Sequence, residues 1–317
     1  MTTTLPTTTL YIGDCLDILK DHRRRYHAII TDPPYEIGLH GKEWDTTGVS
    51  FSPELWRLLY DALKPGGFIA AFSTARHYHR LAQAAEAANF IIYPFLGWTF
   101  ANGLPKPINV SELCDRELPE RPIIGWRQGS GFTRANVDQG VQRRTHTTFA
   151  VKARHVSSEA KQWEGWYYGV NCLRPIQEPI LLAQKPIRSL ATGRQALLDN
   201  LRKHCTGALN LGALRARYGG GWPSTQLDHA KARRTDHGST HPSVKPIGLL
   251  EDLCLLLCPP AGHILDPFGG TGTTALAARL HGFTCTLIEI NRDMEVVIRR
   301  RLGEDPRSDH VRMATTG

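Results

Sequence analysis

Residues His263–Glu289, HILDPFGGTGTTALAARLHGFTCTLIE, give the clearest indication of how this chain folds. A short apolar run is followed by a turn with three glycines among residues 269–272, then by an alanine-rich segment of helical character. A second apolar run, 285–290, ends the unit. Glycines at the start of a helix let the backbone approach a ligand closely. The order strand, glycine turn, helix, strand predicts an α/β unit with a ligand at its turn.

This turn differs from the loops that bind nucleotide phosphates. It lacks the G-K-[ST] ending of a P-loop and the strict G-x-G-x-x-G of dinucleotide-binding proteins. The following strand ends in Glu289, 17 residues after Gly272. A carboxylate at the carboxyl end of a strand can accept hydrogen bonds from both hydroxyls of a ribose. The pattern favours a ribose-containing cofactor over a site for nucleotide phosphates.

The same alternation of strands and helices extends through most of the chain. Strand-like apolar runs lie at 10–12, 28–31, 68–72, 90–95 and 180–183, and helical patterns at 51–63, 76–89, 246–257, 272–281 and 292–302. Residues 102–171 break the pattern, with scattered glycines, prolines, arginines and aromatics. The sequence therefore predicts a doubly wound α/β sheet with an insertion.

Composition excludes several classes of protein. The 317 residues are 41% hydrophobic and 21% charged, and no apolar run approaches the roughly 18 residues of a membrane span. The threonine-rich start lacks the features of a signal peptide. Seven cysteines without a C-x-x-C pair argue against disulfides and structural zinc. We expect a cytoplasmic protein without metal.

Positive charge is concentrated in the middle of the chain. Residues 121–235 contain 19 Lys and Arg against 6 Asp and Glu, whereas the rest contains 19 against 24. Such an asymmetry indicates a polyanionic partner, and nucleic acid is the obvious one. Aromatic residues that can stack on bases lie among these cations: Trp163, Trp166, Tyr167, Tyr168, Tyr218 and Trp222.

The tetrapeptide Asp32-Pro33-Pro34-Tyr35 carries the sharpest chemical signal. The exocyclic amine of adenine or cytosine is a poor nucleophile because its lone pair is delocalised into the ring. The Asp32 carboxylate and the Pro33 carbonyl can each accept one amine hydrogen, which frees the lone pair and stabilises the growing positive charge. Tyr35 offers a face on which a base taken out of the duplex can stack.

Together, the two motifs resemble those of the amino-specific DNA methyltransferases that use S-adenosylmethionine, in the permuted beta class where D-P-P-Y precedes F-x-G-x-G. Further similar segments are Tyr11–Cys15, Leu63–Gly67, Gln177–Ile180, His241–Pro246 and the phage-like loop Gly41–Asp45. The resemblance implies a Rossmann-like, circularly permuted, mostly parallel sheet of seven strands with inserted DNA-recognition segments. It also implies double-stranded DNA as partner and, weakly, a homodimer.

The resemblance assigns site residues position by position. The catalytic residues would be Asp32, Pro33, Pro34 and Tyr35. The cofactor residues would be Asp14, Cys15, His241, Pro242, Lys245, Asp266, Pro267, Phe268, Gly269, Gly270, Thr271, Gly272, Thr273 and Glu289. Candidate DNA contacts are Lys42, Trp44, Arg143, Arg144, Arg215, Arg217, Arg233 and Arg234.

Domain boundaries follow from the same motifs. We expect a catalytic half at 8–106, a basic and aromatic insertion that contacts DNA or mediates dimerisation at 107–171, and a returning strand at 172–186. Target recognition is expected at 187–240, the cofactor half at 241–303 and a flexible tail at 304–317. Which inserted segment reads the bases stays open at this stage.

Two local features receive plain interpretations. Arg299–Arg301 is expected to be the solvated end of a helix rather than a phosphate clamp, because cations favour that end. Cys254 and Cys258 lie on one helical face and are expected to be buried small hydrophobes rather than metal ligands.

The predicted activity is methylation of N6 of a flipped adenine, because cytosine-N4 members more often have Ser at the position of Asp32. Cytosine-N4 methylation is the nearest alternative. A nicotinamide dehydrogenase would explain the glycine turn but not the D-P-P-Y motif. A non-catalytic DNA-binding protein is the third alternative, against which both motifs argue.

Overall fold

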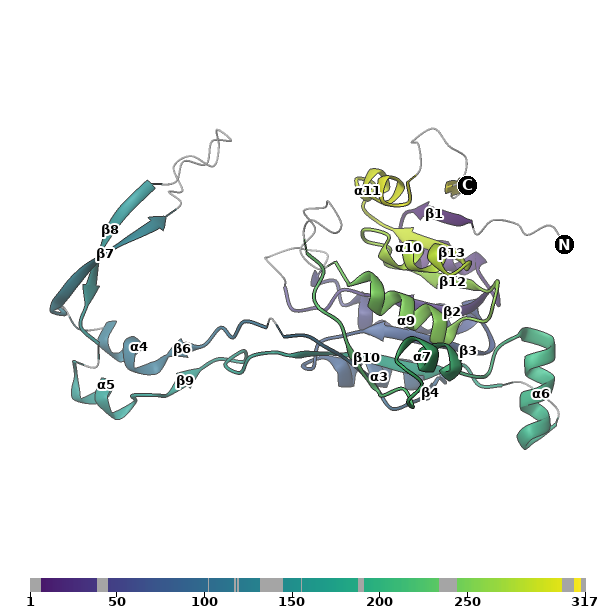
Figure 1. Ribbon diagram of the computed structural model, residues 1–317, viewed down its shortest axis with the longest axis horizontal. Coiled ribbons are helices and arrows are strands. Elements are labelled where there is room, and N and C mark those ends of the chain that lie inside the picture. The colour runs from purple at the N-terminus through teal and green to yellow at the C-terminus, as the bar shows by residue number, and fades with distance from the viewer. Residues whose placement is uncertain are drawn as a thin grey trace. The chain divides into compact units, whose positions relative to one another are not determined.

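The computed structural model describes residues 7–38, 45–101, 103–116, 118, 120–131, 145–154, 156–187, 191–233, 244–303 and 311–314 (Figure 1). The chain forms two units. The larger unit contains Met1–Asn102 and Ile176–Gly317, and the smaller contains Gly103–Pro175. The predicted insertion, 107–171, falls inside the smaller unit.

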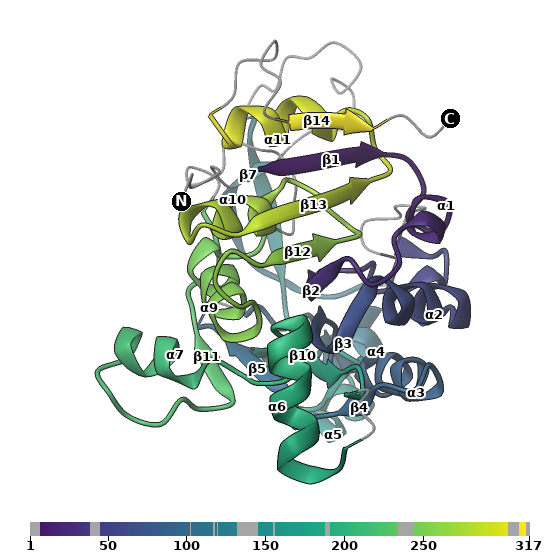
Figure 2. The ribbon, with the colours of Figure 1, turned by 90° about the vertical axis from the view of Figure 1, so that its right-hand side faces the viewer.

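A ten-stranded sheet forms the larger unit (Figure 2). Its order is β11 (Gln226–Asp228), β5 (Leu96–Thr99), β10 (Gln177–Gln184), β3 (Leu63–Phe72), β2 (Tyr26–Thr31), β12 (His263–Asp266), β13 (Thr284–Glu289), β1 (Thr8–Ile12) and β14 (Val311–Ala314), with β4 (Ile91–Ile92) on β10. Strand β10 runs antiparallel to β3, β4 and β5, and the other described pairs are parallel.

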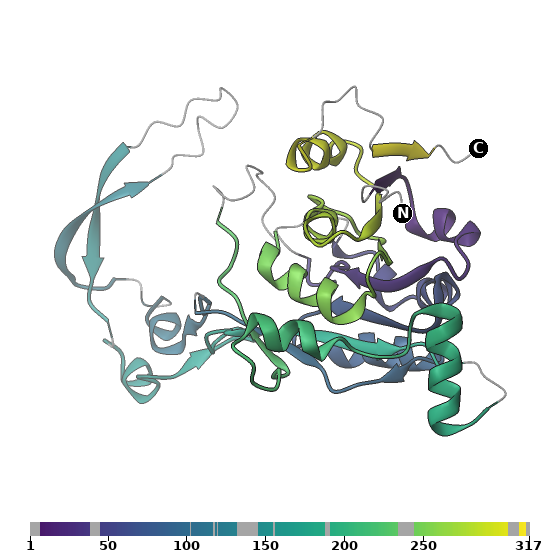
Figure 3. The same ribbon diagram turned by 45° about the vertical axis from the view of Figure 1, so that its right-hand side comes forward.

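Helices cover both faces of this sheet, as a doubly wound fold requires. Along β2, Ala28 and Ile30 belong to one apolar cluster and Ile29 to the other, because successive side chains point to opposite faces. The first cluster includes residues of α7 (Leu211–Arg217), α9 (Ile247–Leu257), α10 (Thr273–Leu280) and α11 (Met294–Arg301). The second includes residues of α1 (Cys15–Ile18), α2 (Pro53–Ala62) and α3 (Tyr78–Ala87). Figure 3 shows helices on both sides of the sheet. The unit also contains α6 (Gly193–His204) and the short 3-10 helices η1 (Leu19–Asp21) and η4 (Val49–Phe51).

The α/β fold class is confirmed, but two details of the prediction are wrong. The sheet has ten described strands instead of seven. Strands β11 and β14 are edge strands of three and four residues that leave no apolar periodicity in the sequence, and the single strand expected at 90–95 corresponds to β4, which β5 follows as a separate strand. The expected flexible tail, 304–317, includes β14, which pairs in parallel with β1.

The smaller unit is built from short elements. Strand β6 (Ile108–Asn109) pairs with β9 (Tyr167–Tyr168), and β7 (Ile123–Gly131) forms a hairpin with β8 (Thr145–Lys152). Helices α4 (Val110–Arg116) and α5 (Ser158–Gln162) pack together, and the buried Ser111 hydroxyl donates to the carbonyl of Ala160. The Asp115 carboxylate accepts from the backbone amides of Val156 and Ser157. No helix of the described residues is long and apolar enough to cross a membrane.

Candidate active site

The D-P-P-Y segment lies directly after the carboxyl end of β2. Two prolines end the strand ladder because they lack the amide hydrogen. The turn is fixed from outside: the Ser50 hydroxyl donates to the Pro34 carbonyl over 2.5 Å, and His77 Nδ1 lies 2.8 Å from the Tyr35 carbonyl. No described donor reaches the Pro33 carbonyl, so this acceptor is available to a ligand.

Lys245, which the sequence assigned to the cofactor, binds Asp32 of the D-P-P-Y segment. Its ammonium donates to Asp32 Oδ2 over 2.6 Å, and its side chain is only 7% exposed. Three rings surround the ammonium, at 5.0 Å from the centroids of Tyr35 and Phe72 and 5.9 Å from that of Trp98. Aromatic faces attract cations, so these three rings contribute to holding the buried Lys245 side chain in place.

Asp32 keeps one oxygen for another partner. Its Oδ1 atom is buried and has no hydrogen-bond partner among the described residues. A buried oxygen without a donor costs free energy unless a ligand supplies one. The geometry therefore offers two acceptors, Asp32 Oδ1 and the Pro33 carbonyl, to the two hydrogens of an amine.

Glu178 of β10 completes this cluster, although it was not among the predicted site residues. Tyr35 donates its hydroxyl hydrogen to Glu178 Oε2 over 2.8 Å, and Lys245 Nζ lies 3.8 Å from the same oxygen. Because β10 is antiparallel to β3, the start of β10 lies beside the end of β3, as the pairing of Ile180 with Phe72 shows. The only sequence signal was the Glu-Pro-Ile segment itself.

Burial and charge set the protonation of these groups. Burial raises the pKa of Asp32, while the Lys245 ammonium opposes this rise and the Glu178 charge adds to it. Burial, reinforced by the charges of Asp32 and Glu178, raises the pKa of Tyr35 well above its ordinary value. Tyr35 is thus neutral, and Lys245, with a smaller contribution from the Tyr35 hydroxyl, favours the carboxylate form of Asp32.

The glycine turn lies between β12 and α10. Gly270 and Gly272 have φ values of +51° and +78°, in the left-handed region that favours glycine. A Cβ atom on Gly272 would also lie 3.1 Å from Ile298 Cγ2. The Gly269 amide donates to the Ile288 carbonyl over 2.8 Å, which joins the turn to β13.

Glu289 ends β13 beside this turn. Its carboxylate accepts from the amides of Gly270 and Asn291 over 2.7 and 2.8 Å. Burial raises its pKa, and these two amides oppose the rise. Ile12 pairs with Glu289, which brings the end of β1 and the exposed Asp14 to the same edge of the sheet. Asp14 Oδ1 also accepts from the Leu16 amide over 2.8 Å and caps α1.

Other predicted cofactor residues have structural surroundings. Cys15 is buried among apolar side chains, and burial raises the pKa of its thiol to about 12. Asp266 is buried and accepts from the hydroxyls of Thr31 and Thr274, over 2.9 and 2.6 Å, and from the Phe268 amide. It therefore joins β2 to the glycine turn. Pro267, Thr271 and Thr273 belong to the same turn, and both threonines are buried.

Arg301 clamps the glycine turn, contrary to the expectation of a solvated helix end. Its Nη1 group donates to the Thr271 carbonyl over 2.8 Å and lies 2.7 and 2.8 Å from the hydroxyls of Thr271 and Thr273. Arg299 is also buried and pairs with Glu295. The sequence missed this because helical spacing alone does not show that α11 packs against the turn. Cys254 and Cys258 are buried, as expected.

These residues fit a nucleoside sulfonium cofactor. The left-handed Gly270 carries no side chain that would cover the turn, and the acceptor Glu289 stands beside it. Asp14 at the end of β1 offers a second carboxylate on the same sheet edge. Ligands of parallel α/β sheets bind outside the carboxyl ends of the strands, which is where all these groups lie.

The structure describes only some of the remaining predicted positions. Lys42, Trp44, Arg143, Arg144, Arg234, His241 and Pro242 lie outside the described residues. Arg215 is exposed on α7, with its guanidinium 5.0 Å from the Trp222 ring centroid. Arg233 ends the described part of the segment.

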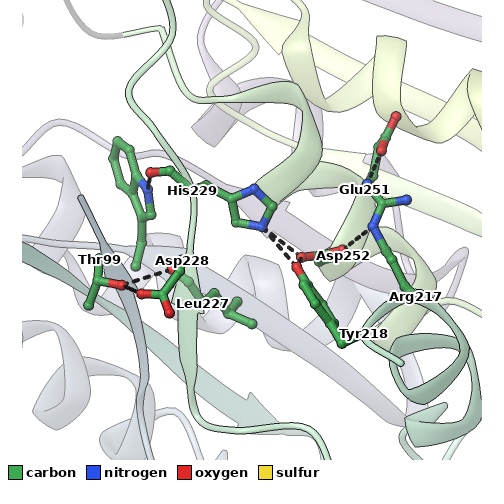
Figure 4. A network of polar contacts seen from close by, with 9 residues as sticks. Thr99, Arg217, Tyr218, Leu227, Asp228, His229, Glu251 and Asp252 are labelled. Carbon is green, nitrogen blue, oxygen red and sulfur yellow. Dashed lines mark hydrogen bonds and ion pairs between the residues drawn. The ribbon is translucent and has the colours of Figure 1, made fainter. Parts of the chain in front are cut away.

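Arg217 is a correction to the predicted DNA contacts. Its guanidinium binds Glu251 and, over 2.7 Å, the fully buried carboxylate of Asp252 on α9 (Figure 4). His229 Nε2 lies 2.7 Å from the same carboxylate, and Tyr218 donates its hydroxyl hydrogen to it. Arg217 thus joins α7 to α9 through two carboxylates of α9.

Comparisons with known proteins agree with this chemistry. The N6_N4_Mtase family, described as DNA methylase, matches residues 26–299. Type II methyltransferase M.HindIII of Haemophilus influenzae is 28% identical over 292 residues, which cover 85% of this chain and 87% of that protein. Type II methyltransferase M.ScaI of Streptomyces caespitosus is 32% identical over 80 residues, 25% of this chain and 26% of that protein.

Solved structures share the fold. The PvuII DNA methyltransferase (cytosine-N4-specific) has a TM-score of 0.58 at 13% identity, over 97% of this chain and 90% of that one. The M1.HpyAVI complex with S-adenosylmethionine has a TM-score of 0.52 at 16% identity, over 93% and 99%. No group of three or more His, Cys, Asp or Glu in the described ranges could hold a metal ion. The chain belongs to the DNA methylase family and is a DNA methyltransferase that uses S-adenosylmethionine.

Proposed function

We propose that the protein methylates N6 of an adenine that is flipped out of duplex DNA, by direct transfer without a covalent enzyme intermediate. The observation that carries this proposal is the unpartnered Asp32 Oδ1, which stands beside an Oδ2 atom already held by Lys245. An acidic residue at this position also agrees with the resemblance to adenine-specific members rather than to the Ser-containing cytosine-N4 members.

Each residue has a distinct task in this proposal. Asp32 Oδ1 and the Pro33 carbonyl accept the two hydrogens of the adenine amine and draw its nitrogen toward tetrahedral geometry. S-Adenosylmethionine, when bound, supplies the electrophilic methyl group. The two acceptors stabilise the positive charge that develops on the nitrogen during attack, where preorganised dipoles are most effective. The Asp32 carboxylate then accepts a proton from the methylated amine.

The surrounding groups prepare this geometry. Tyr35 stacks on the extruded base, and its neutral hydroxyl bound to Glu178 fixes the orientation of the ring. Stacking of a base on an aromatic side chain contributes about 1–3 kcal/mol. Gly270 and Glu289 hold the nucleoside end of the cofactor, with Asp14 on the same edge of the sheet. Lys245 keeps Asp32 ionised through their 2.6 Å contact.

Nucleoside analysis of methylated DNA tests the proposal. Plasmid DNA from a host without its own methyltransferases is incubated with the protein and S-adenosylmethionine, digested to nucleosides and analysed by mass spectrometry. We expect N6-methyldeoxyadenosine and no N4-methyldeoxycytidine. A product containing N4-methyldeoxycytidine alone would refute adenine specificity while leaving the family assignment intact.

A further inference from the structure

The β7–β8 hairpin of the smaller unit is a two-stranded sheet of its own. The strands pair from Ile123 with Lys152 to Gly131 with Thr145, and no other described strand pairs with either. An isolated two-stranded hairpin is at best marginally stable in water. A ribbon of this kind needs something to cover it.

Large apolar side chains are exposed on both faces of the hairpin. Trp126, on one face, is 67% exposed, and Ile124, at the bulge between Ile123 and Gly125, is 69% exposed. Phe149 and Val151 share the other face with Arg127, which pairs directly with Phe149, and all three are exposed. A hydrophobic partner alone does not explain a face that also carries a cation.

The charge of the hairpin is of one sign. The described ranges 121–131 and 145–154 contain Arg121, Arg127, Lys152 and Arg154 and no Asp or Glu. Arg154 pairs with Glu112 of α4, whereas Arg127 and Lys152 are exposed and have no anionic partner among the described residues. This sign complements a polyanion and would repel a second copy of the same surface.

The dimensions of the hairpin suit DNA. The major groove of B-DNA admits a two-stranded β-ribbon. At about 3.3 Å per residue, the nine residues of β7 span roughly 30 Å, close to one turn of the double helix. Exposed Arg and aromatic side chains are the types that contact guanine edges, phosphates and thymine methyl groups.

We infer that the β7–β8 hairpin binds the major groove of the substrate DNA, with Arg127 and Lys152 as contacts. This inference rests on DNA being the substrate and is independent of which base is methylated. It assigns the insertion to DNA contact rather than to dimerisation.

A charge-reversal pair tests the inference. The hairpin variant carries Arg127→Glu and Lys152→Glu. The control variant carries Arg23→Glu and Arg25→Glu, an equal change of charge at exposed positions just before β2, at the opposite end of this strand from the D-P-P-Y segment. Binding to a 30-base-pair duplex of mixed sequence is followed by fluorescence anisotropy at several salt concentrations. We expect the hairpin variant to lose at least tenfold in affinity at about 0.1 M salt. Its slope of log K against log salt concentration should be flatter than that of wild type by about 2, whereas the control variant should keep the wild-type slope. Equal slopes for both variants would overturn the inference.

A second measurement addresses the groove and the competing occupant. A duplex with glucosylated hydroxymethylcytosines has sugars that fill its major groove. Wild type should bind this duplex more weakly than the plain duplex. The affinity of the hairpin variant should differ much less between the two duplexes. Sedimentation should give the same mass for both proteins. If the hairpin variant becomes monomeric while its salt slope is that of wild type, the hairpin is a dimer contact and the inference fails. Calorimetric affinity for S-adenosylmethionine should stay unchanged, which separates this result from misfolding and from any error about the methylated base.

Discussion

The ammonium of Lys245 lies 2.6 Å from Oδ2 of Asp32, although 213 residues separate them in the sequence. Asp32 follows β2, and Lys245 precedes α9, whose side chains pack in the same apolar cluster as Ala28 and Ile30 of β2. Lys245, from a segment that resembles a cofactor-binding motif, thereby forms an ion pair with Asp32, from a segment that resembles a catalytic motif. The pair couples the ionisation of the catalytic acid to the segment before α9.

Replacement of Lys245 by Met should move the pH dependence of methyl transfer. Because the ammonium lowers the pKa of Asp32, its loss raises that pKa, and the acidic limb of kcat/KM should shift to higher pH. Lys245→Arg keeps the charge and should restore the wild-type profile in part. An unshifted limb in Lys245→Met would show that Asp32 is not the titrating group.

Replacement of Glu178 by Gln should move the same limb in the opposite direction. The Glu178 charge raises the pKa of Asp32, so its removal favours the carboxylate and shifts the limb to lower pH. The Gln side chain can still accept the hydrogen of the Tyr35 hydroxyl, so affinity for DNA should change little. Rates are measured with tritiated S-adenosylmethionine between pH 5 and 9. A shift in the same direction as that of Lys245→Met would contradict the charge argument.

Replacement of Asp32 by Asn should abolish methyl transfer without loss of cofactor binding. The amide presents an NH₂ group or a neutral oxygen to the adenine amine and cannot stabilise its positive charge, so kcat should fall by at least 10²–10³, as for the loss of other preorganised electrostatic groups. Calorimetry with S-adenosylmethionine supplies the control. Activity near wild type would refute the role assigned to Asp32.

Replacement of Arg301 by Ala should weaken cofactor binding more than it slows the reaction. The guanidinium holds the Thr271 carbonyl and two hydroxyls of the glycine turn, and charge-assisted hydrogen bonds are worth about 1.5–3 kcal/mol each. We expect KM for S-adenosylmethionine to rise about tenfold or more, with kcat within a few-fold. Arg300→Ala, at the neighbouring exposed position, is the matched control. Equal effects of the two variants would exclude the clamp.

Replacement of Asp266 by Asn should remove a pH-dependent loss of stability. Burial raises the pKa of Asp266 from 3.8 to about 7, so the folded protein retains a proton that the unfolded chain has already released. The free energy of unfolding contributed by this group therefore falls as the pH rises from about 4 to 7, by about 4 kcal/mol at most. Urea unfolding is measured at pH 5 and 8. The free energy of unfolding of Asp266→Asn, relative to that of wild type, should be higher at pH 8 than at pH 5. A difference that is the same at both values would mean an unperturbed carboxyl.

Sequence patterns were sufficient for the elements that are buried on both faces. The runs at 28–31, 68–72 and 285–290 lie in β2, β3 and β13, because strands covered by helices on both sides must be apolar throughout. The edge strands β11 and β14 escaped prediction, since three or four residues at an edge need no such pattern, and the run at 90–95 predicted one strand where the chain forms β4 and then β5. Their pairing depends on partners far away in the chain.

Local sequence patterns were enough to predict the α/β fold, the glycine turn, the D-P-P-Y motif and the charge asymmetry, because each depends on residues close together in the chain. Contacts between distant side chains became known only from the folded chain. Glu178 reaches Tyr35 because β10 is antiparallel, Arg301 reaches the glycine turn because α11 packs back on it, and Arg217 is held by the buried Asp252. Such contacts follow from strand order and helix packing, which local periodicity does not encode.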